Sequence, residues 1–340
     1  MAFYVSLFIS RKNLLSTFKS PPSPDYEAAI SGATYFHQAQ AGYLRITGID
    51  RQAFLQRQST NDLRKLEPGL SLVTVLTTPA ARILDVLTLL EEPEAIDVIT
   101  LPSYGDKTAR YLKSRIFFMD KVSLEDASSE HSQIELIGPQ SQVMLQRMGL
   151  PFPGDERHVV SGEIAGNPVR ILEQHQPSYR LLFPTAAFSE ISAALRAAGT
   201  LSLSLESYEN LRVEAGVPAA GFELTEENTP LETGLAWAVS DSKGCYTGQE
   251  VIARQITYDK ITHQMVGLRL ERPAQTGDHL QSLEDNKSVG LVTSAVRSPR
   301  FGPIALAIVR RPHHTSGTQF TLGEQANRSI ATVVDLPFQL

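Results

Sequence analysis

The octapeptide Lys243-Gly244-Cys245-Tyr246-Thr247-Gly248-Gln249-Glu250 contains the only cysteine of the 340-residue chain. The residues after its second glycine are typical of the first turns of a helix. Thr247 followed by Glu250 three positions later matches the capping-box pattern, which predicts Thr247 as the helix N-cap. Cys245 would then lie just outside the helix N-terminus, where the helix dipole and the charge of Lys243 both favour the thiolate. The two glycines would let the backbone turn sharply or approach a ligand closely.

Two interpretations of Cys245 stay open. A lone cysteine is most often a small buried apolar residue. Here its neighbours are polar residues and glycines, which favours a reactive thiol or a loop that contacts a ligand, and Cys245 is the candidate catalytic residue. A single cysteine excludes an internal disulfide and a self-contained iron–sulfur or zinc–thiolate site, which needs about four ligands. The eight histidines show no metal-ligand spacing, so no metal site is expected.

From Lys243 to Arg254 the chain reads KGCYTGQEVIAR. This stretch resembles the signature of the YgfZ family, folate-binding proteins connected with iron–sulfur cluster assembly and repair. That family is related to the T-protein of the glycine cleavage system, an aminomethyltransferase. The resemblance implies an accessory protein of iron–sulfur maturation, with tetrahydrofolate or a one-carbon derivative in a central cavity beside the octapeptide. The alternatives are a folate-dependent aminomethyltransferase or other one-carbon transferase, and a folate-binding module without chemistry, so enzymatic turnover stays open.

Two further segments resemble motifs of the T-protein superfamily. Residues 48–63 resemble its opening motif, with Gly48-x-Asp50, Phe54-Leu55-Gln56 and Thr60-Asn61-Asp62-Leu63 in order. Residues 211–216 resemble its Leu-Arg-x-Glu-x-Gly segment, with Arg212 and Glu214 at the charged positions. Read alone, the first is a plain strand–helix–turn with a capping aspartate, and the second is an ordinary helix with solvated charges. If the fold brings these segments to residues 85 and 245, they line one cavity.

The chain departs from the T-protein pattern at two places. In the expected strand Ile83-Leu84-Asp85-Val86-Leu87 the T-protein pattern has two consecutive aspartates, tied to folate chemistry, and here the second is Val86. Asp85 could also point to the solvated face, because strand faces alternate. The Tyr-Thr-Gly-Glu element of the transferase is replaced by Gln174-His175-Gln176-Pro177-Ser178-Tyr179. Both departures predict that the chain does not catalyse aminomethyl transfer.

The remaining candidate residues follow from the chemical groups that a bound folate would need. A pterin needs paired donors and acceptors with apolar or aromatic walls, and its glutamate tail needs a cationic mouth. Tyr246, Trp237 and Arg254 are candidates for the walls and the mouth. The predicted folate-binding residues are Asn61, Asp85, Arg212, Glu214, Trp237, Lys243, Gly244, Tyr246, Gly248, Gln249 and Arg254.

Composition is that of a soluble globular protein, with 42% apolar and 20% charged residues. The net charge of −6 argues against nucleic acid as a partner, and no stretch reaches the length of a membrane span. The expected partners are folate and iron–sulfur proteins or maturation factors, without nucleic acid or a membrane. Residues 1–24 contain no acid and are basic, as a presequence for the mitochondrial matrix would be, and this is the alternative location. Their composition favours a disordered N-terminus of a cytoplasmic protein.

The expected fold class is α+β, a multi-domain T-protein-like fold with antiparallel sheets. Residues 72–76 and 82–90 should pair as a hairpin, and the mixture of elements before residue 260 shows no regular βαβ alternation. Residues 25–260 would form the folate-binding region of two interleaved α+β lobes. Residues 261–340 change to short alternating strands and predict a small C-terminal β-barrel or jelly-roll domain.

Overall fold

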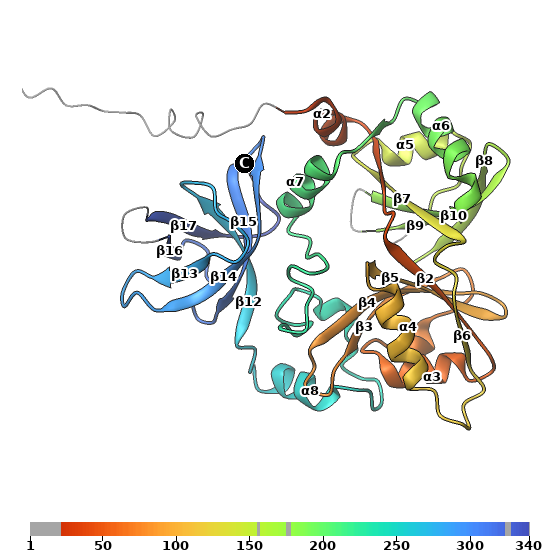
Figure 1. Cartoon of the computed structure of the whole chain (residues 1–340), viewed down its shortest axis with the longest axis horizontal. Coiled ribbons are helices and arrows are strands. Elements are labelled where there is room, and N and C mark those ends of the chain that lie inside the picture. The colour runs from red at the N-terminus through yellow and green to blue at the C-terminus, as the bar shows by residue number, and fades with distance from the viewer. Residues whose placement is uncertain (1–21, 155–156, 175–177, 324–327, 340) are drawn as a thin grey trace, which may run out of the picture. The chain divides into compact units, whose positions relative to one another are not determined.

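The computed structural model describes residues 22–154, 157–174, 178–323 and 328–339, so most of the N-terminal prediction for residues 1–24 lies outside the described part. Antiparallel sheets, short helices and a closed C-terminal barrel confirm the predicted α+β class (Figure 1). One compact unit comprises residues 23–208 and 219–262. The other contains residues 209–218 and the described part of 263–340. No helix in the described ranges is long and apolar enough to cross a bilayer.

The first sheet of the larger unit has five strands in the order β3-β4-β5-β2-β6. Its strands are β2 (Ala41–Thr47), β3 (Ser71–Thr77), β4 (Ile83–Glu91), β5 (Ala95–Pro102) and β6 (Ser123–Asp126). The predicted hairpin is confirmed, since β3 and β4 pair antiparallel. The associated helices are α3 (Arg51–Gln58), the 3-10 turn η1 (Leu63–Lys65) and α4 (Gly105–Ser114). Apolar side chains from one sheet face and from these helices form one core, which includes Leu87, Leu112 and Phe54.

The second sheet of this unit has six strands in the order β11-β1-β7-β10-β9-β8. Its strands are β1 (Thr34–His37), β7 (His131–Ile137), β8 (Val159–Ile164), β9 (Asn167–Glu173), β10 (Ser178–Pro184) and β11 (Leu201–Ser202). The neighbouring helices are α2 (Pro24–Ser31), α5 (Ser141–Arg147), η2 (Thr185–Ala187) and α6 (Phe188–Ala197). Because β1 precedes the whole first sheet and β7 follows it, the two sheets interleave along the chain. A small core that includes Tyr43 and Leu182 joins them.

The C-terminal strands close into a barrel in the order β12-β15-β14-β13-β16-β17. They are β12 (His263–Leu270), β13 (His279–Ser282), β14 (Ser288–Ser298), β15 (Gly302–Arg310), β16 (Gln319–Leu322) and β17 (Ser329–Val334). Strand β12 pairs with both β15 and β17, which closes the barrel and removes free edges. Helix α7 (Leu205–Ala215) contributes Val213 to a core with Phe301 and Phe338. The remaining elements are η3 (Ala236–Ala238) and α8 (Gln249–Thr257).

Candidate functional site

The octapeptide leads into α8, but its cap differs from the prediction. Helix α8 begins at Gln249, and its N-cap is Gly248 in the left-handed conformation, with φ of 86°. The prediction of Thr247 as N-cap is therefore wrong. Thr247 instead uses its backbone: its N–H donates to the Arg57 carbonyl at 3.3 Å, and its carbonyl accepts from the Thr77 hydroxyl at 2.7 Å. Contacts from distant segments thus override the local capping pattern.

The two glycines of the octapeptide have different structural roles. At Gly248 a Cβ would lie 2.7 Å from the Thr77 hydroxyl oxygen and 2.8 Å from the Thr78 carbonyl oxygen. Its positive φ also disfavours any other residue. At Gly244 a Cβ would meet nothing within 4 Å. Gly248 is therefore required by the fold, whereas Gly244 leaves open space beside Cys245.

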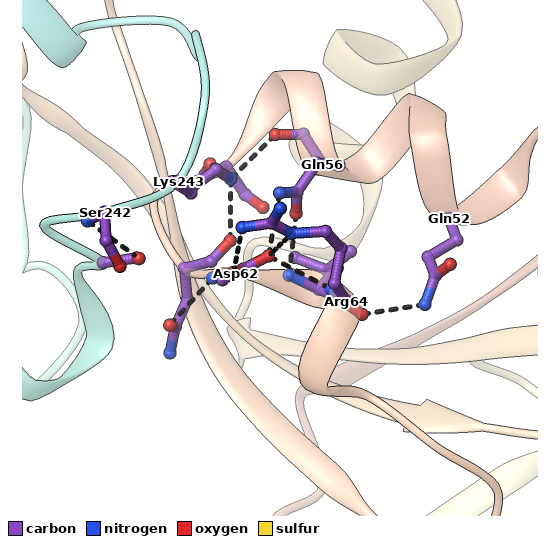
Figure 2. Close-up of polar contacts among 10 residues, drawn as sticks. Gln52, Gln56, Asp62, Arg64, Ser242 and Lys243 are labelled. Atoms are coloured by element: carbon purple, nitrogen blue, oxygen red, sulfur yellow. Dashed lines mark hydrogen bonds and ion pairs between the residues drawn. The ribbon is translucent and has the colours of Figure 1, made fainter.

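Lys243 anchors the octapeptide to the loop that follows α3 (Figure 2). Its side chain is buried, and its ammonium donates to the carbonyl oxygens of Gln56 at 2.8 Å, Ser59 at 2.6 Å and Asn61 at 2.7 Å. Carbonyls at a helix C-terminus carry partial negative charge, which favours a cation there. Burial lowers the pKa of Lys243 to about 8, and the nearby charge of Asp62 opposes this shift. The ammonium thus holds this loop in place. The sequence instead predicts that its charge favours the thiolate of Cys245.

The loop after α3 is itself ordered by the residues of the opening motif. The Asn61 amide donates to the Val73 carbonyl at 2.8 Å, which ties the loop to β3. The Asp62 carboxylate accepts from the Arg64 guanidinium at 2.7 Å and from the Gln56 amide at 3.0 Å (Figure 2). These hydrogen bonds, of which that from Arg64 is the strongest, hold the pKa of Asp62 well below its usual range. The motif residues Asn61 and Asp62 therefore build the platform on which Lys243 is held.

A third set of contacts joins the same two segments. The Ser240 N–H donates to the Thr60 carbonyl at 3.0 Å, and the Thr60 hydroxyl donates to the Ala238 carbonyl at 2.7 Å. Residues 56–62 and 238–248 therefore lie side by side, although they are far apart in the sequence. The structure thus brings together the predicted site residues Asn61, Lys243 and Gly248.

The residues around Cys245 separate into buried and exposed ones. Cys245 is exposed. Tyr246 is buried against Ala81 and Ile252. The Lys243 ammonium lies 5.0 Å from the centroid of the Tyr246 ring. Burial raises the pKa of Tyr246 to about 12. The loop thus presents the thiol outward while its aromatic residue packs inward.

Three other predicted site residues lie near this loop. Trp237 is 51% exposed. The Gln249 N–H donates to the Tyr246 carbonyl at 3.2 Å, and Arg254 is exposed and paired with Glu250 at 2.6 Å. Because Glu250 makes this ion pair one turn along α8, it does not close the predicted capping box. The role of Arg254 as a cationic mouth stays a prediction.

Asp85 and Val86 face opposite sides of the first sheet. Asp85 is fully buried and accepts hydrogen bonds from the Thr108 hydroxyl in α4 and from the Leu101 N–H at 3.1 Å. Burial raises the pKa of Asp85 to about 7, against the opposing effect of these hydrogen bonds. The alternative that Asp85 points to solvent is wrong, because the face toward α4 is covered. Its contact with folate stays a prediction, while its observed contacts hold α4 on the sheet.

Val86 belongs to the other, apolar face of the same sheet. It is partly buried beside Val73 and Leu101, next to a core formed by Val75, Ile83, Leu224, Leu235 and Ala238. Side chains alternate along a strand, so the second position of the aspartate pair in the T-protein pattern corresponds to this face. In this chain that face carries a valine in place of the carboxylate.

Arg212 and Glu214 belong to the other compact unit. The buried Arg212 guanidinium donates to the Val217 carbonyl at 2.9 Å and to the Ser294 hydroxyl at 3.0 Å, and it pairs with Glu209. Glu214 accepts from the Arg300 guanidinium at 3.1 Å. These charges are not solvated, so the interpretation of an ordinary helix with solvated charges is wrong for both. Their contribution to one cavity with Lys243 stays a prediction.

Sequence reasoning missed a polar set between the two sheets of the larger unit. Gln133 is 1% exposed, and neither the nitrogen nor the oxygen of its side chain has a partner among the described residues. His131, on the same face of β7, stacks on Tyr43 with ring centroids 3.9 Å apart. Asp97 accepts hydrogen bonds from Tyr43 and, at 2.9 Å, from Arg170. The only signal for this set is Asp97 within an otherwise apolar strand.

Two cavities lie elsewhere in the molecule. One of about 200 Å³ is lined by residues that include Leu70, Glu91, Val159 and Arg170, and one of about 340 Å³ in the barrel by residues that include Arg272 and Asp278. None of the predicted site residues lines either cavity. In the described part of the chain, no three His, Cys, Asp or Glu side chains are grouped so as to hold a metal ion.

Comparison with protein families gives two matches that together span most of the chain. Residues 21–243 match the GCVT N-terminal domain, and residues 263–339 match the glycine cleavage T-protein C-terminal barrel domain. The chain is also 30% identical over 314 residues to a chloroplastic protein of Arabidopsis thaliana that is named only as a transferase. That alignment covers 90% of this chain and 72% of the relative.

Two further similarities concern aminomethyltransferases. The chain is 26% identical over 327 residues to the aminomethyltransferase of Listeria monocytogenes serotype 4b, covering 92% of this chain and 88% of the relative. The crystal structure of the glycine cleavage system aminomethyltransferase T from Bartonella henselae matches with a TM-score of 0.83 at 20% identity. It covers 94% of this chain and 91% of that chain, which shows a common fold.

Proposed function

The chain belongs to the glycine cleavage T-protein family, and from this premise we propose that it is a tetrahydrofolate-binding accessory protein of iron–sulfur cluster assembly or repair. Folate would lie in a central cavity next to the octapeptide loop. The folate-dependent family supports the cofactor, and the resemblance of residues 243–254 to the YgfZ signature supports the iron–sulfur role.

The observation that carries the proposal is the side chain at position 86. An aminomethyltransferase of this family has a second aspartate there, and in this chain Val86 occupies the apolar face beside Val73 and Leu101. Asp85 cannot replace it, because its carboxylate points to α4 on the opposite face and is fully buried. A valine in place of the second aspartate supports folate binding without aminomethyl transfer.

The residues of the larger unit include groups that suit a folate. The Gln133 amide, without a partner among the described residues, offers a donor nitrogen and an acceptor oxygen side by side, as an aminopyrimidinone edge requires. A buried unpaired amide is costly unless a ligand satisfies it. Val73, Val86 and Leu101 are candidates for the apolar wall of a ring site. When bound, tetrahydrofolate supplies a carrier for a one-carbon unit. Gln133 would orient the ring through its hydrogen bonds.

Cys245 is the residue that would act chemically in this proposal. Its thiol is exposed on a loop that Lys243 and Thr247 hold to the α3 platform. A loop fixed on both sides of one exposed thiol can present that thiol to a partner protein at a constant position. This arrangement supports a role of Cys245 toward an iron–sulfur protein or maturation factor, while the buried Tyr246 and Lys243 hold the loop.

One observation favours the alternative function, a folate-dependent aminomethyltransferase or other one-carbon transferase. The aminomethyltransferase of Listeria monocytogenes aligns with 92% of this chain. A glycine cleavage assay reconstituted with a lipoyl carrier protein separates the two functions. The proposed function predicts no aminomethyl transfer above background, whereas sustained turnover would support the transferase.

The experiment for the proposed function is a deletion strain rescued by the wild-type chain or by Cys245→Ala. We expect the activity of iron–sulfur enzymes to fall on deletion and to return only with the wild type. Titration calorimetry with tetrahydrofolate on the same proteins should give micromolar affinity for both, as is typical of a pocketed cofactor. We propose a cytoplasmic location, with an organelle as the alternative, which the word chloroplastic in the name of the Arabidopsis relative supports.

A further inference from the structure

Four large apolar side chains protrude together from the larger unit. Phe117, Phe118 and Met119, in the turn after α4, are 67%, 96% and 75% exposed, and Ile49 is 79% exposed. Ile49 lies in the turn beside them, because the Lys121 N–H donates to the carboxylate of the next residue, Asp50, at 2.9 Å. We call these four residues the apolar knob. Large exposed apolar side chains that lie close together mark an interaction site more often than single scattered ones do.

The knob is held in place by an ordered turn. Ile116, just before it, packs against the core of the first sheet. The Asp120 carboxylate accepts from the Phe117 N–H at 3.0 Å and from the Arg57 guanidinium at 2.8 Å. The fold therefore fixes three consecutive large apolar side chains outward, although turning them inward would bury apolar surface.

Cationic side chains flank the knob on both sides. Lys113 and Arg115 precede it, Lys121 follows it, and all three are exposed. None of them has an ion-pair partner among the residues that the structure describes, whereas the acidic Asp120 inside the turn is paired with Arg57. The Asp50 carboxylate, next to Ile49, offsets one of these three cations, so the knob keeps a local excess of positive charge on a chain whose net charge is −6.

We propose that the apolar knob docks the protein on a bilayer that contains anionic lipid. Side chains of Phe and Met insert at the boundary between headgroups and acyl chains, and flanking Lys and Arg residues bind lipid phosphates. This interfacial binding needs no membrane span, so it is compatible with helices too short to cross a bilayer. The lack of a span, which predicted no membrane partner, does not bear on interfacial binding.

The shape and charge of the knob favour a bilayer over a protein. A standard protein interface uses about 20–30 residues a side, whereas the knob consists of four side chains. A second copy of the chain is disfavoured, because a symmetric contact through the knob would bring the cations of the two copies, Lys113, Arg115 and Lys121, close to one another. An acidic protein is the remaining rival and is an outcome of the test.

Docking of the knob would also position the candidate site. Arg57 holds the knob through its side chain on Asp120, and its carbonyl accepts the hydrogen bond from the Thr247 N–H. One residue therefore links the docking turn to the octapeptide that presents Cys245. The docking proposal itself stands on exposure and charge, independently of the proposed function.

The test uses the full-length protein and vesicles of known composition. Sedimentation with vesicles of phosphatidylcholine and phosphatidylglycerol in equal parts should recover the protein at low salt, and recovery should fall with added salt. Phe118→Asp should weaken this binding about tenfold or more, because it places a charge where an aromatic ring inserts. Lys121→Glu should weaken binding to anionic vesicles but not the weaker binding to pure phosphatidylcholine.

Matched variants separate docking from misfolding and from unspecific adsorption. Leu283→Asp changes an exposed leucine of the barrel unit, and Arg272→Glu changes an exposed cation there; neither should alter vesicle binding. Phe118→Trp in a Trp237→Phe background makes residue 118 the only tryptophan, and brominated lipid should quench its fluorescence.

Several outcomes would overturn the docking proposal. They are no binding to anionic vesicles, equal binding by Phe118→Asp with unchanged circular dichroism, or no quenching by brominated lipid. In the first case an acidic protein would be the remaining candidate partner of the knob.

Discussion

The ammonium of Lys243 lies 2.6 Å from the carbonyl oxygen of Ser59, a residue 184 positions earlier in the chain. This contact and its two neighbours fix the start of the octapeptide to the end of α3. The lysine of the motif is therefore a buried structural anchor, and the exposed cysteine two residues later takes its position from it.

Lys243→Met should destabilise the protein strongly. The change keeps most of the apolar stem but leaves three carbonyl oxygens without their donor, which costs about 3 kcal/mol in the free energy of unfolding. Urea denaturation followed by circular dichroism measures this. Lys260→Met, at an exposed lysine, is the matched control and should change stability by less than about 0.5 kcal/mol. Equal effects of the two changes would mean that Lys243 is not an anchor.

Asp85 should give stability a distinct pH dependence. Its folded pKa of about 7 lies above the unfolded value near 3.8, so between these values the folded state holds a proton that the unfolded state has lost. The contribution of Asp85 to the free energy of unfolding is fully present below the unfolded pKa and is lost as the pH rises to the folded pKa. The loss is at most about 1.4 kcal/mol per pH unit. Asp85→Asn cannot titrate, so its stability relative to the wild type should rise between pH 4 and 7. Parallel curves for the two proteins would contradict the burial of a titrating carboxyl group.

The two glycines of the octapeptide make a matched pair. Gly248→Ala puts a methyl group against the Thr77 and Thr78 oxygens at positive φ, and it should cost about 2 kcal/mol or more. Gly244→Ala, with open space around the new carbon, should stay within about 0.5 kcal/mol of the wild type. Thermal and urea unfolding of both variants test this. A cost at Gly244 equal to that at Gly248 would show that the loop has a different conformation.

Patterns in the sequence predict the fold well where the residues of a segment alone determine its secondary structure. The β3–β4 hairpin and the C-terminal barrel follow from alternating apolar residues and turn residues. The N-cap of α8 does not follow from such local patterns, because Gly248 is required by its contact with Thr77 and Thr78, about 170 residues away. Strand alternation predicts that Asp85 and Val86 face opposite sides, but only the packing of α4 decides which side is buried.

Gln133 could not be identified from the sequence for a related reason. It occupies an ordinary strand position, and its lack of partners in the described part of the chain depends on how the two sheets of the larger unit pack. The same holds for Lys243, whose three acceptors come from a segment far away in the chain. Polar residues whose partners are distant carry no local signature.

Gln133→Leu should have opposite effects on stability and on folate binding. Replacing a buried amide that has no partner among the described residues by an apolar side chain should stabilise the protein by about 1–2 kcal/mol. If the amide orients the pterin, the same change should weaken tetrahydrofolate binding about tenfold or more. Calorimetry and urea unfolding on one preparation measure both. Unchanged affinity in a stabilised variant would remove Gln133 from the proposed folate site.

The most direct test of the central claim is the activity of a [4Fe–4S] enzyme in extracts of a deletion strain. We predict that this activity falls on deletion, returns with the wild-type chain, and does not return with Cys245→Ala expressed at the same level. Unchanged iron–sulfur enzyme activity on deletion, together with loss of glycine cleavage, would contradict the account and identify the chain as an aminomethyltransferase.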